Sequence, residues 1–275
     1  MAELKLDVSP RKVAWFLAVA IVCLTTASVL SQWYRFELER GQRSGIIDRL
    51  YLDNEESIAT WFQSAVLLSC AALLGSIAQD KRRTGDASAR PWGALAGIFL
   101  VLSLDEVAAL HELTMRRLRD ALHVSGVFYF AWVIPGMLVV LVVGALYVKF
   151  ILGLDRETRR RVIVAAALYV AGALGMEMVS GAYASVYGVD TLVYATALVT
   201  LEELLEMAGM SLFLYALLCY RESDAGLPAL PDVGTGIANG NVGHLRVVRR
   251  GRDAGGHGLR SKPYERTTSA TSTRK

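Results

Sequence analysis

The sequence predicts an all-α, polytopic membrane protein with six transmembrane helices, both termini in the cytoplasm and a disordered, basic C-terminal tail. The chain is 53% hydrophobic with a mean hydropathy of +0.38, which is more apolar than an ordinary soluble domain. Its apolar residues gather in six stretches that are long enough to cross a bilayer, which takes about 20 helical residues. The connecting segments are basic on alternate sides, as expected for a protein that crosses a membrane repeatedly.

The six spans are expected at residues 13–34, 57–79, 91–113, 127–150, 162–187 and 191–220, which together make a transmembrane domain of residues 13–220. Residues 1–12 form a short N-terminus. The alternative for the first span is a cleaved signal peptide, but its apolar run exceeds the core of about 7–15 residues in such peptides, so we expect a retained helix. Residues 221–275 hold ten Lys/Arg against five Asp/Glu and few apolar residues, which predicts a disordered tail.

Lysine and arginine near the ends of the spans indicate the orientation. The N-terminus, residues 80–90, residues 155–161 and the tail are all basic and fall on one side of the membrane. That side is predicted to be the cytoplasm. The expected location is therefore a plasma membrane, the inner membrane of a bacterium, with both termini inside the cell.

The third span ends in a stretch, Ser103-Leu-Asp-Glu-Val-Ala-Ala-Leu-His-Glu-Leu113, that carries four ionisable side chains. A charge at the centre of a bilayer costs about 2.5–3.5 kcal/mol on the insertion scale, so such residues are rare and usually functional. A second stretch, Thr200-Leu-Glu-Glu-Leu-Leu-Glu206, repeats the pattern of a hydroxyl, a leucine and two acids. Glu177 stands alone in the apolar run between the two stretches.

The acids are expected to lie in one layer in the outer half of the membrane. With a rise of about 1.5 Å per residue, Asp105, Glu177 and Glu206 lie roughly 21–24 Å from the cytoplasmic ends of their helices. Gln63 of the second span falls in the same layer. His111 and Glu112 come at about 31–33 Å, near the outer surface.

Helical geometry limits which of these side chains can face one cavity. Glu202, Glu203 and Glu206 span only about 100° of arc and can all point inward. On the third span Asp105 and Glu112 share a face, whereas Glu106 and His111 diverge to opposite sides of it. We therefore expect Asp105, Glu112 and either Glu106 or His111 to face the site.

The combined charge of this layer needs neutralisation. Seven carboxyl groups left ionised would cost on the order of 20 kcal/mol, and the interior of the spans offers no lysine or arginine to pair with them. Bound divalent metal ions, protonation or a water-filled cavity are the three ways to lower that cost. Histidine-rich membrane enzymes such as desaturases are excluded, because His111 and His123 are the only histidines near the spans.

The first hypothesis is a metal-dependent membrane enzyme, an oxidoreductase or a hydrolase. The Glu203-x-x-Glu206 spacing resembles the ligand pattern of the carboxylate-bridged di-iron proteins of the ferritin-like class, with an acid in place of their histidine. The resemblance is one of ligand type only. Four or more acids with at most one histidine favour iron, manganese or zinc over copper, and the position of the site in the membrane favours a lipid-like substrate. The candidate metal ligands are Asp105, Glu106, His111, Glu112, Glu177, Glu202, Glu203 and Glu206.

The second hypothesis is a proton- or cation-coupled transporter or channel that uses the same acids. The similarity of Ser103-Leu-Asp-Glu106 to Thr200-Leu-Glu-Glu203, three spans apart, is what two inverted three-helix repeats would produce, and that arrangement is common in transporters. A structural or subunit role is the third alternative. The expected partners are membrane lipid and a small-molecule substrate, with no nucleic acid.

Overall fold

The structure is a computed structural model that describes residues 9–37 and 45–225, without the side chains of Glu112, Thr114, Arg116 and Ala225. This part of the chain is all-α. Its long helices are α1 (Pro10–Glu37), α3 (Ile58–Arg83), α4 (Ala89–Ala108), α6 (Val133–Gly153), α7 (Arg156–Val170), α8 (Glu177–Tyr187) and α9 (Val199–Ala225). The shorter elements are α2 (Gly45–Leu50), α5 (Leu110–Leu122), the 3-10 turn η1 (Gly126–Phe128) and two π-helical segments, η2 (Ala171–Met176) and η3 (Tyr194–Leu198). The predicted disordered tail, from residue 226 onward, lies outside the described residues.

Five described helices are long and apolar enough to cross a membrane, which confirms the prediction of a multi-span membrane protein. They are α1, α3, α4, α6 and the continuous helical stretch Arg156–Tyr187, which contains α7, η2 and α8. The sixth predicted span corresponds to α9, which is 27 residues long. It packs lengthwise against α1, α3 and α7.

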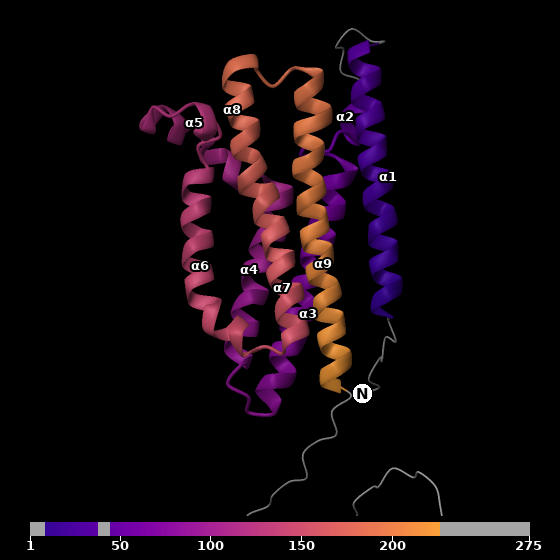
Figure 1. Cartoon of the computed structure of the whole chain (residues 1–275), viewed down its shortest axis with the longest axis vertical. Helices are drawn as coiled ribbons and strands as arrows, with labels where there is room; N and C mark the ends of the chain where they lie inside the picture. The colour runs from indigo at the N-terminus through magenta and orange to yellow at the C-terminus, as the bar shows by residue number, and fades with distance from the viewer. Residues whose placement is uncertain (1–8, 38–44, 226–275) are drawn as a thin grey trace, which may run out of the picture. The chain divides into compact units, whose positions relative to one another are not determined.

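Helix α9 is the centre of the helix arrangement, and α3 and α4 pair as a hairpin beside it (Figure 1). The core lies between α3 and α9, where Leu67, Leu74, Met207, Met210 and Leu217 are fully buried. Small residues bring α7 against α9. A Cβ atom at Gly209 would come within 2.6 Å of the Tyr169 backbone nitrogen, so glycine is needed for this approach.

The third span is shorter than predicted, and the predicted loop at residues 115–126 is largely helical. Helix α4 ends at Ala108 because Ala109 adopts a left-handed conformation with φ of 45°. The chain then turns sideways into α5, which projects from the bundle near the end where α8 stops (Figure 1). His111 therefore lies on α5, and so does the backbone of Glu112, so the directions expected for one straight helix do not apply to them.

The last helix is longer than predicted. It continues past Tyr220 to Ala225, because its final turn binds to α3. Arg221 donates to Ser76 Oγ at 2.6 Å, and Lys81 Nζ lies 2.8 Å from an Asp224 carboxylate oxygen. Polar residues 221–225, assigned to the tail from composition, are thus an ordered helix end.

Candidate functional site

Five glutamates from three helices gather in one region, which we call the glutamate layer: Glu106 of α4, Glu177 at the first turn of α8, and Glu202, Glu203 and Glu206 of α9. Their carboxyl groups interact electrostatically across the helices. Glu206 interacts with both Glu106 and Glu177, and Glu203 interacts with Glu106 and Glu206. Glu202 interacts with Glu177, Glu203 and Glu206. The layer therefore joins acids that are up to 100 residues apart in the sequence.

One side of the layer is a pair of adjacent carboxyl groups. The carboxyl groups of Glu177 and Glu202 lie next to each other. Two carboxyl groups this close repel each other while both are ionised, so a proton on one of them would let them share a hydrogen bond. Each also accepts a hydrogen bond from a neighbouring helix or turn. Trp132 Nε1 donates to Glu177 Oε1 at 2.9 Å, and Ser180 Oγ donates to Glu202 Oε2 at 3.0 Å. The pair thus has the geometry of a site that holds one proton between two acids.

The other side of the layer contains Glu106, Glu203 and Glu206, with the amide of Gln63 from α3. Gln63 is 2% exposed, and its Nε2 donates to Glu203 Oε2 at 2.5 Å. Its carbonyl oxygen Oε1 is buried without a hydrogen-bond partner among the described residues. Buried amide oxygens are normally bonded to a donor, so this oxygen is an acceptor that a proton donor or a cation could satisfy.

The backbone is irregular at each place where these acids lie. The π-helical segment η2 ends immediately before Glu177, and η3 ends four residues before Glu202. The third acid-bearing helix, α4, breaks shortly after Glu106. π-Helical turns occur frequently at functional sites because they redirect side chains within an otherwise regular helix. The local structure thus marks the same three positions as the acids do.

Gly172 within η2 brings its helix directly against the acids of α9. A Cβ atom at this position would lie 2.7 Å from Glu206 Cγ and 2.8 Å from the backbone oxygen of Glu202. A contact this short with backbone excludes any larger residue unless the helices separate. The close approach places Glu177 at the height of Glu202 on the neighbouring helix.

Asp105 and His111 form a separate pair at the break between α4 and α5. The backbone nitrogen of His111 donates to Asp105 Oδ1 at 3.0 Å, and His111 Nδ1 lies 3.0 Å from Asp105 Oδ2. Asp105 therefore caps the first turn of α5. The His111 ring contacts the ring of Trp132, with centroids 4.9 Å apart. Of the residues expected to face one site together, the structure places Glu106 in the glutamate layer and Asp105 at its edge.

Several residues that contact the layer were not predicted as site residues, among them Trp132, Tyr169, Ser180 and Gly172. Tyr169 of α7 interacts electrostatically with Glu206, Glu106, Asp105 and Glu203. Ser180 follows Glu177 by three residues, which is one helical turn, so its spacing was a usable signal. Trp132 is indistinguishable in sequence from an aromatic residue at a membrane interface. Nothing in the sequence identifies Gly172 among the other glycines.

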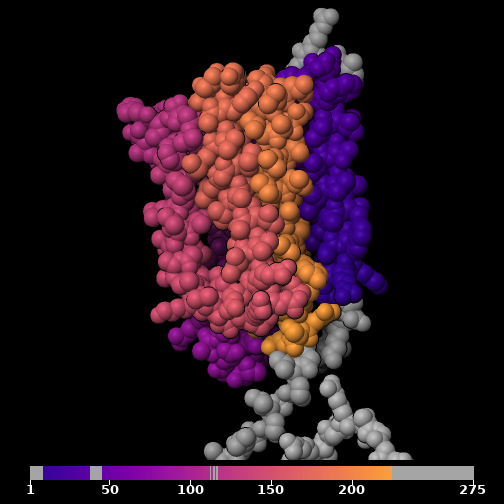
Figure 2. Space-filling model, viewed as in Figure 1, coloured from indigo at the N-terminus to yellow at the C-terminus, as the bar shows by residue number. Residues whose placement is uncertain are grey.

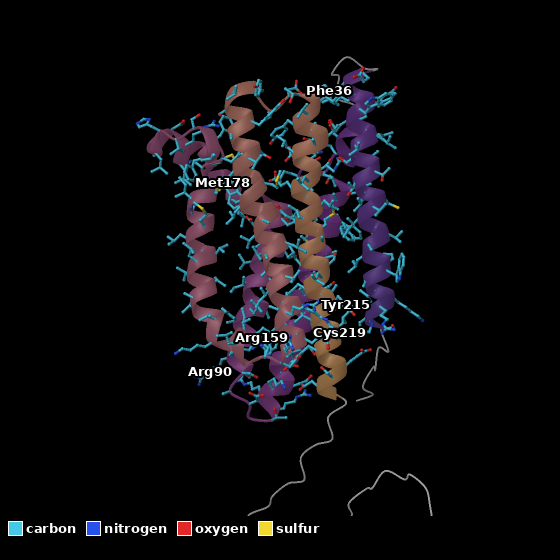
Figure 3. The ribbon with its side chains drawn as sticks, viewed as in Figure 1. Phe36, Arg90, Arg159, Met178, Tyr215 and Cys219 are labelled. Carbon is cyan, nitrogen blue, oxygen red and sulfur yellow. The ribbon has the colours of Figure 1, made fainter. Side chains whose placement is uncertain are left out.

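The layer lies away from the basic end of the bundle. Met178, the neighbour of Glu177, is in the half opposite Arg90 and Arg159 (Figure 3). Within residues 9–37 and 45–225, no lysine or arginine forms an ion pair with any of the five glutamates. In the same residues, no group of three or more His, Cys, Asp or Glu side chains is arranged to hold a metal ion. The eight-residue metal centre and its iron, manganese or zinc therefore stay predictions, and the side chain of Glu112 lies outside the described part.

Comparison with known proteins identifies the family but no activity. Residues 13–220 match the family model described as a domain of unknown function, DUF8692, and this is most of the chain, so the chain belongs to that family. No curated protein and no solved structure gives a significant match.

Proposed function

We propose that this member of the DUF8692 family is a proton-coupled transporter of the plasma membrane, with six spans and with the glutamate layer as its proton-binding site. The observation that carries the proposal is the adjacent pair of carboxyl groups of Glu177 and Glu202, because two such groups can share a hydrogen bond only while one of them is protonated. Gaining or losing that proton changes the charge of a site that lies among membrane spans. Intramembrane acids of this kind are typical of proton pathways.

The proposed topology counts α9 as the sixth span and places both termini in the cytoplasm. Its support is the shared position of basic residues at one end of the bundle, in the α3–α4 turn, in the α6–α7 turn and at Arg221 near the end of α9. The glutamate layer then lies in the outer half of the membrane. Reporter fusions after residues 85 and 223 are expected to report the cytoplasm, whereas a fusion after residue 45 is expected to report the exterior.

The irregular helices support transport more than a purely structural role. Transporters bind ions and substrates near the membrane midplane, where interrupted helices free backbone groups and redirect side chains. Here the two π-helical segments and the α4 break accompany the acids. A structural bundle would gain stability from replacing half-buried acids that lack a basic partner by apolar residues, so the presence of five of them indicates a use for their charge.

Proteoliposomes test the proposal directly. The full-length protein is reconstituted with a pH-sensitive dye inside the vesicles, a pH gradient is imposed, and internal pH is followed with candidate solutes outside. Wild type is expected to move protons, and Glu177→Gln and Glu202→Gln are expected to reduce flux to that of protein-free vesicles. Glu157→Gln is the matched control, because the exposed Glu157 forms an ion pair with Arg161 at the opposite, basic end of the bundle. Equal flux in Glu202→Gln and wild type would remove the carboxyl pair from the mechanism.

The metal-dependent enzyme is the second candidate, and one observation favours it. The unpartnered Gln63 Oε1 lies beside Glu203, and a hard cation takes oxygen ligands of both kinds. Metal analysis of detergent-purified protein distinguishes the candidates. The enzyme hypothesis would be favoured over the transporter hypothesis by two results together. Wild type would contain near-stoichiometric iron, manganese or zinc that is lost in Glu203→Gln and Glu206→Gln, and it would show no proton flux.

A further inference from the structure

A groove lies at the basic end of the bundle, between the start of α1, the second turn of α7 and the end of α9. Its volume is about 440 Å³, and its lining comes from all three helices. The lining residues are Ser9, Pro10, Arg11, Arg161, Tyr215, Cys219 and Glu222. The groove is distant from the glutamate layer, because Tyr215 and Cys219 lie with Arg159 at the end opposite Met178 (Figure 3).

The charged side chains of the groove are arranged to bind a ligand that carries one negative charge. Two arginines and one glutamate line it. Arg161 is already paired with Glu157, so Arg11 supplies the positive charge that has no ion-pair partner among the described residues. Arg161 is fixed in place, because Glu157, which lies outside this groove, pairs with it and its guanidinium lies 5.3 Å from the centre of the Tyr215 ring. Arg11 is exposed and forms no ion pair with any residue in the described part of the chain. Both arginines interact electrostatically with the Tyr215 hydroxyl, so the three polar groups converge.

An apolar surface leads from the groove toward the interior of the membrane. On α9 the residues at successive helical turns above Glu222 are all at least partly exposed, and they form one stripe: Cys219, Tyr215, Leu212, Ala208, Leu205 and Leu201. The outer surface of α9 is visible between α7 and α1 (Figure 2). From Tyr215 to Leu201 the stripe is about 21 Å long, which exceeds the half-thickness of about 15 Å of a hydrocarbon core.

We propose that this groove and stripe bind one anionic phospholipid, with its phosphate between Arg11 and Arg161 and an acyl chain along α9. Arginine presents several N–H groups that bind phosphate oxygens, and the Tyr215 and Ser9 hydroxyls add donors. The exposed Trp15, one turn after Arg11 on α1, suits the headgroup region where tryptophan is enriched in membrane proteins. Free phosphate would use the arginines but would leave the apolar stripe of α9 without a role.

Thermal unfolding of the detergent-purified full chain tests this site. The protein is titrated with short-chain phosphatidylglycerol, with phosphatidylcholine of the same chain length and inorganic phosphate as comparisons. Phosphatidylglycerol is expected to raise the melting temperature of wild type, and the two comparisons are expected to leave it unchanged. Arg11→Gln is expected to weaken the apparent affinity about tenfold, which is the effect of losing a charge-assisted hydrogen bond. Arg90→Gln, an exposed residue at the same end, is the matched control and keeps wild-type affinity.

A second variant separates the acyl chain from the headgroup. Ala208→Phe changes no charge but fills the stripe, and it is expected to lower the affinity for phosphatidylglycerol as well. Wild-type affinity in Arg11→Gln or in Ala208→Phe would overturn the proposed site. An equal shift with phosphatidylcholine would overturn the charge recognition, and an equal shift with inorganic phosphate would overturn the lipid as ligand.

Discussion

The basic end of the helix bundle and the glutamate layer hold their charges in opposite ways. At the basic end, regular helices present charges that face water and are paired, such as Arg221 and Arg83 with Asp80. In the glutamate layer, irregular helices gather five glutamates without a basic partner among the described residues. Exposed pairs contribute little free energy, so the basic end can be built from ordinary helices. Acids that have no basic partner and lie among membrane spans need specific hydrogen bonds and an irregular backbone to hold them in place.

The largest expected effect is on the close helix contact at the glutamate layer. In Gly172→Leu the new side chain would begin 2.8 Å from the Glu202 backbone oxygen, so α7 and α9 would have to separate. We expect a loss of about 1–3 kcal/mol or more in the free energy of unfolding. Thermal unfolding in detergent measures it. The matched control is Gly153→Ala at the basic end, where a Cβ atom meets nothing within 4 Å and where we expect a change within about 0.5 kcal/mol. Equal destabilisation of both variants would contradict the contrast between the basic end and the glutamate layer.

The sequence predicted the multi-span membrane class, and it made the acids conspicuous, because both features can be read from composition along the chain. Hydropathy over 20 residues locates spans, and an acid within a span is conspicuous wherever it points. The break after α4 was missed because it depends on one residue, Ala109, adopting a left-handed conformation that alanine disfavours. The capping of α5 by Asp105 shows why the break persists, but that contact is visible only once the chain has turned.

The similarity between the two acid stretches also has a different meaning in the structure. Inverted repeats would place the similar residues at equivalent positions of their helices. Ser103 instead lies near the end of α4, whereas Thr200 lies in the first turn of α9. Because these helices run in opposite directions (Figure 1), the two stretches meet in one layer without any repeat. The shared pattern therefore gives no support for a duplicated transporter fold.

The next effect concerns the hydrogen bond from Trp132 to Glu177. Trp132→Phe keeps an aromatic ring beside His111 but removes the only described nitrogen that donates to Glu177 Oε1. Glu177 is half-buried, so losing this hydrogen bond is expected to cost about 1 kcal/mol. We expect reduced thermal stability together with slower proton flux in proteoliposomes. Trp61→Phe is the control, because Trp61 is 70% exposed on α3. Unchanged stability and flux in Trp132→Phe would show that Trp132 does not hold the carboxyl pair.

A smaller effect is expected at the break between α4 and α5. Asp105→Ala removes the acceptor for the backbone nitrogen of His111, and loss of such a cap costs about 1 kcal/mol. Hydrogen exchange should become faster in the first turn of α5 while α3 and α9 keep their protection. Asp120→Ala, near the other end of α5, is the control. If α5 exchanges as slowly in Asp105→Ala as in wild type, Asp105 does not cap this helix.

The smallest effect is at the basic end, where a carboxylate faces water. Asp155 precedes α7 and accepts hydrogen bonds from the backbone nitrogens of Glu157 and Thr158, both at 3.0 Å. The hydrogen bonds from Thr158 hold the pKa of Asp155 below its ordinary value. We expect Asp155→Ala to lower the free energy of unfolding by about 1 kcal/mol at neutral pH, with Asp155→Asn, which keeps a capping oxygen, costing less.

The pH dependence of this last effect has a definite sign. Because the folded state lowers the pKa of Asp155, its ionised form stabilises the protein fully above the unfolded pKa of about 3.9. That contribution is lost as the pH falls through the lower pKa of the folded protein. The stability difference between wild type and Asp155→Ala should therefore narrow below about pH 4. Because charges at this end are paired in water, no comparable change is expected between pH 5 and pH 8. If the stability difference between wild type and Asp155→Ala varied across that neutral range, Asp155 would be coupled to a further ionisable group. The contrast between the basic end and the glutamate layer would then fail.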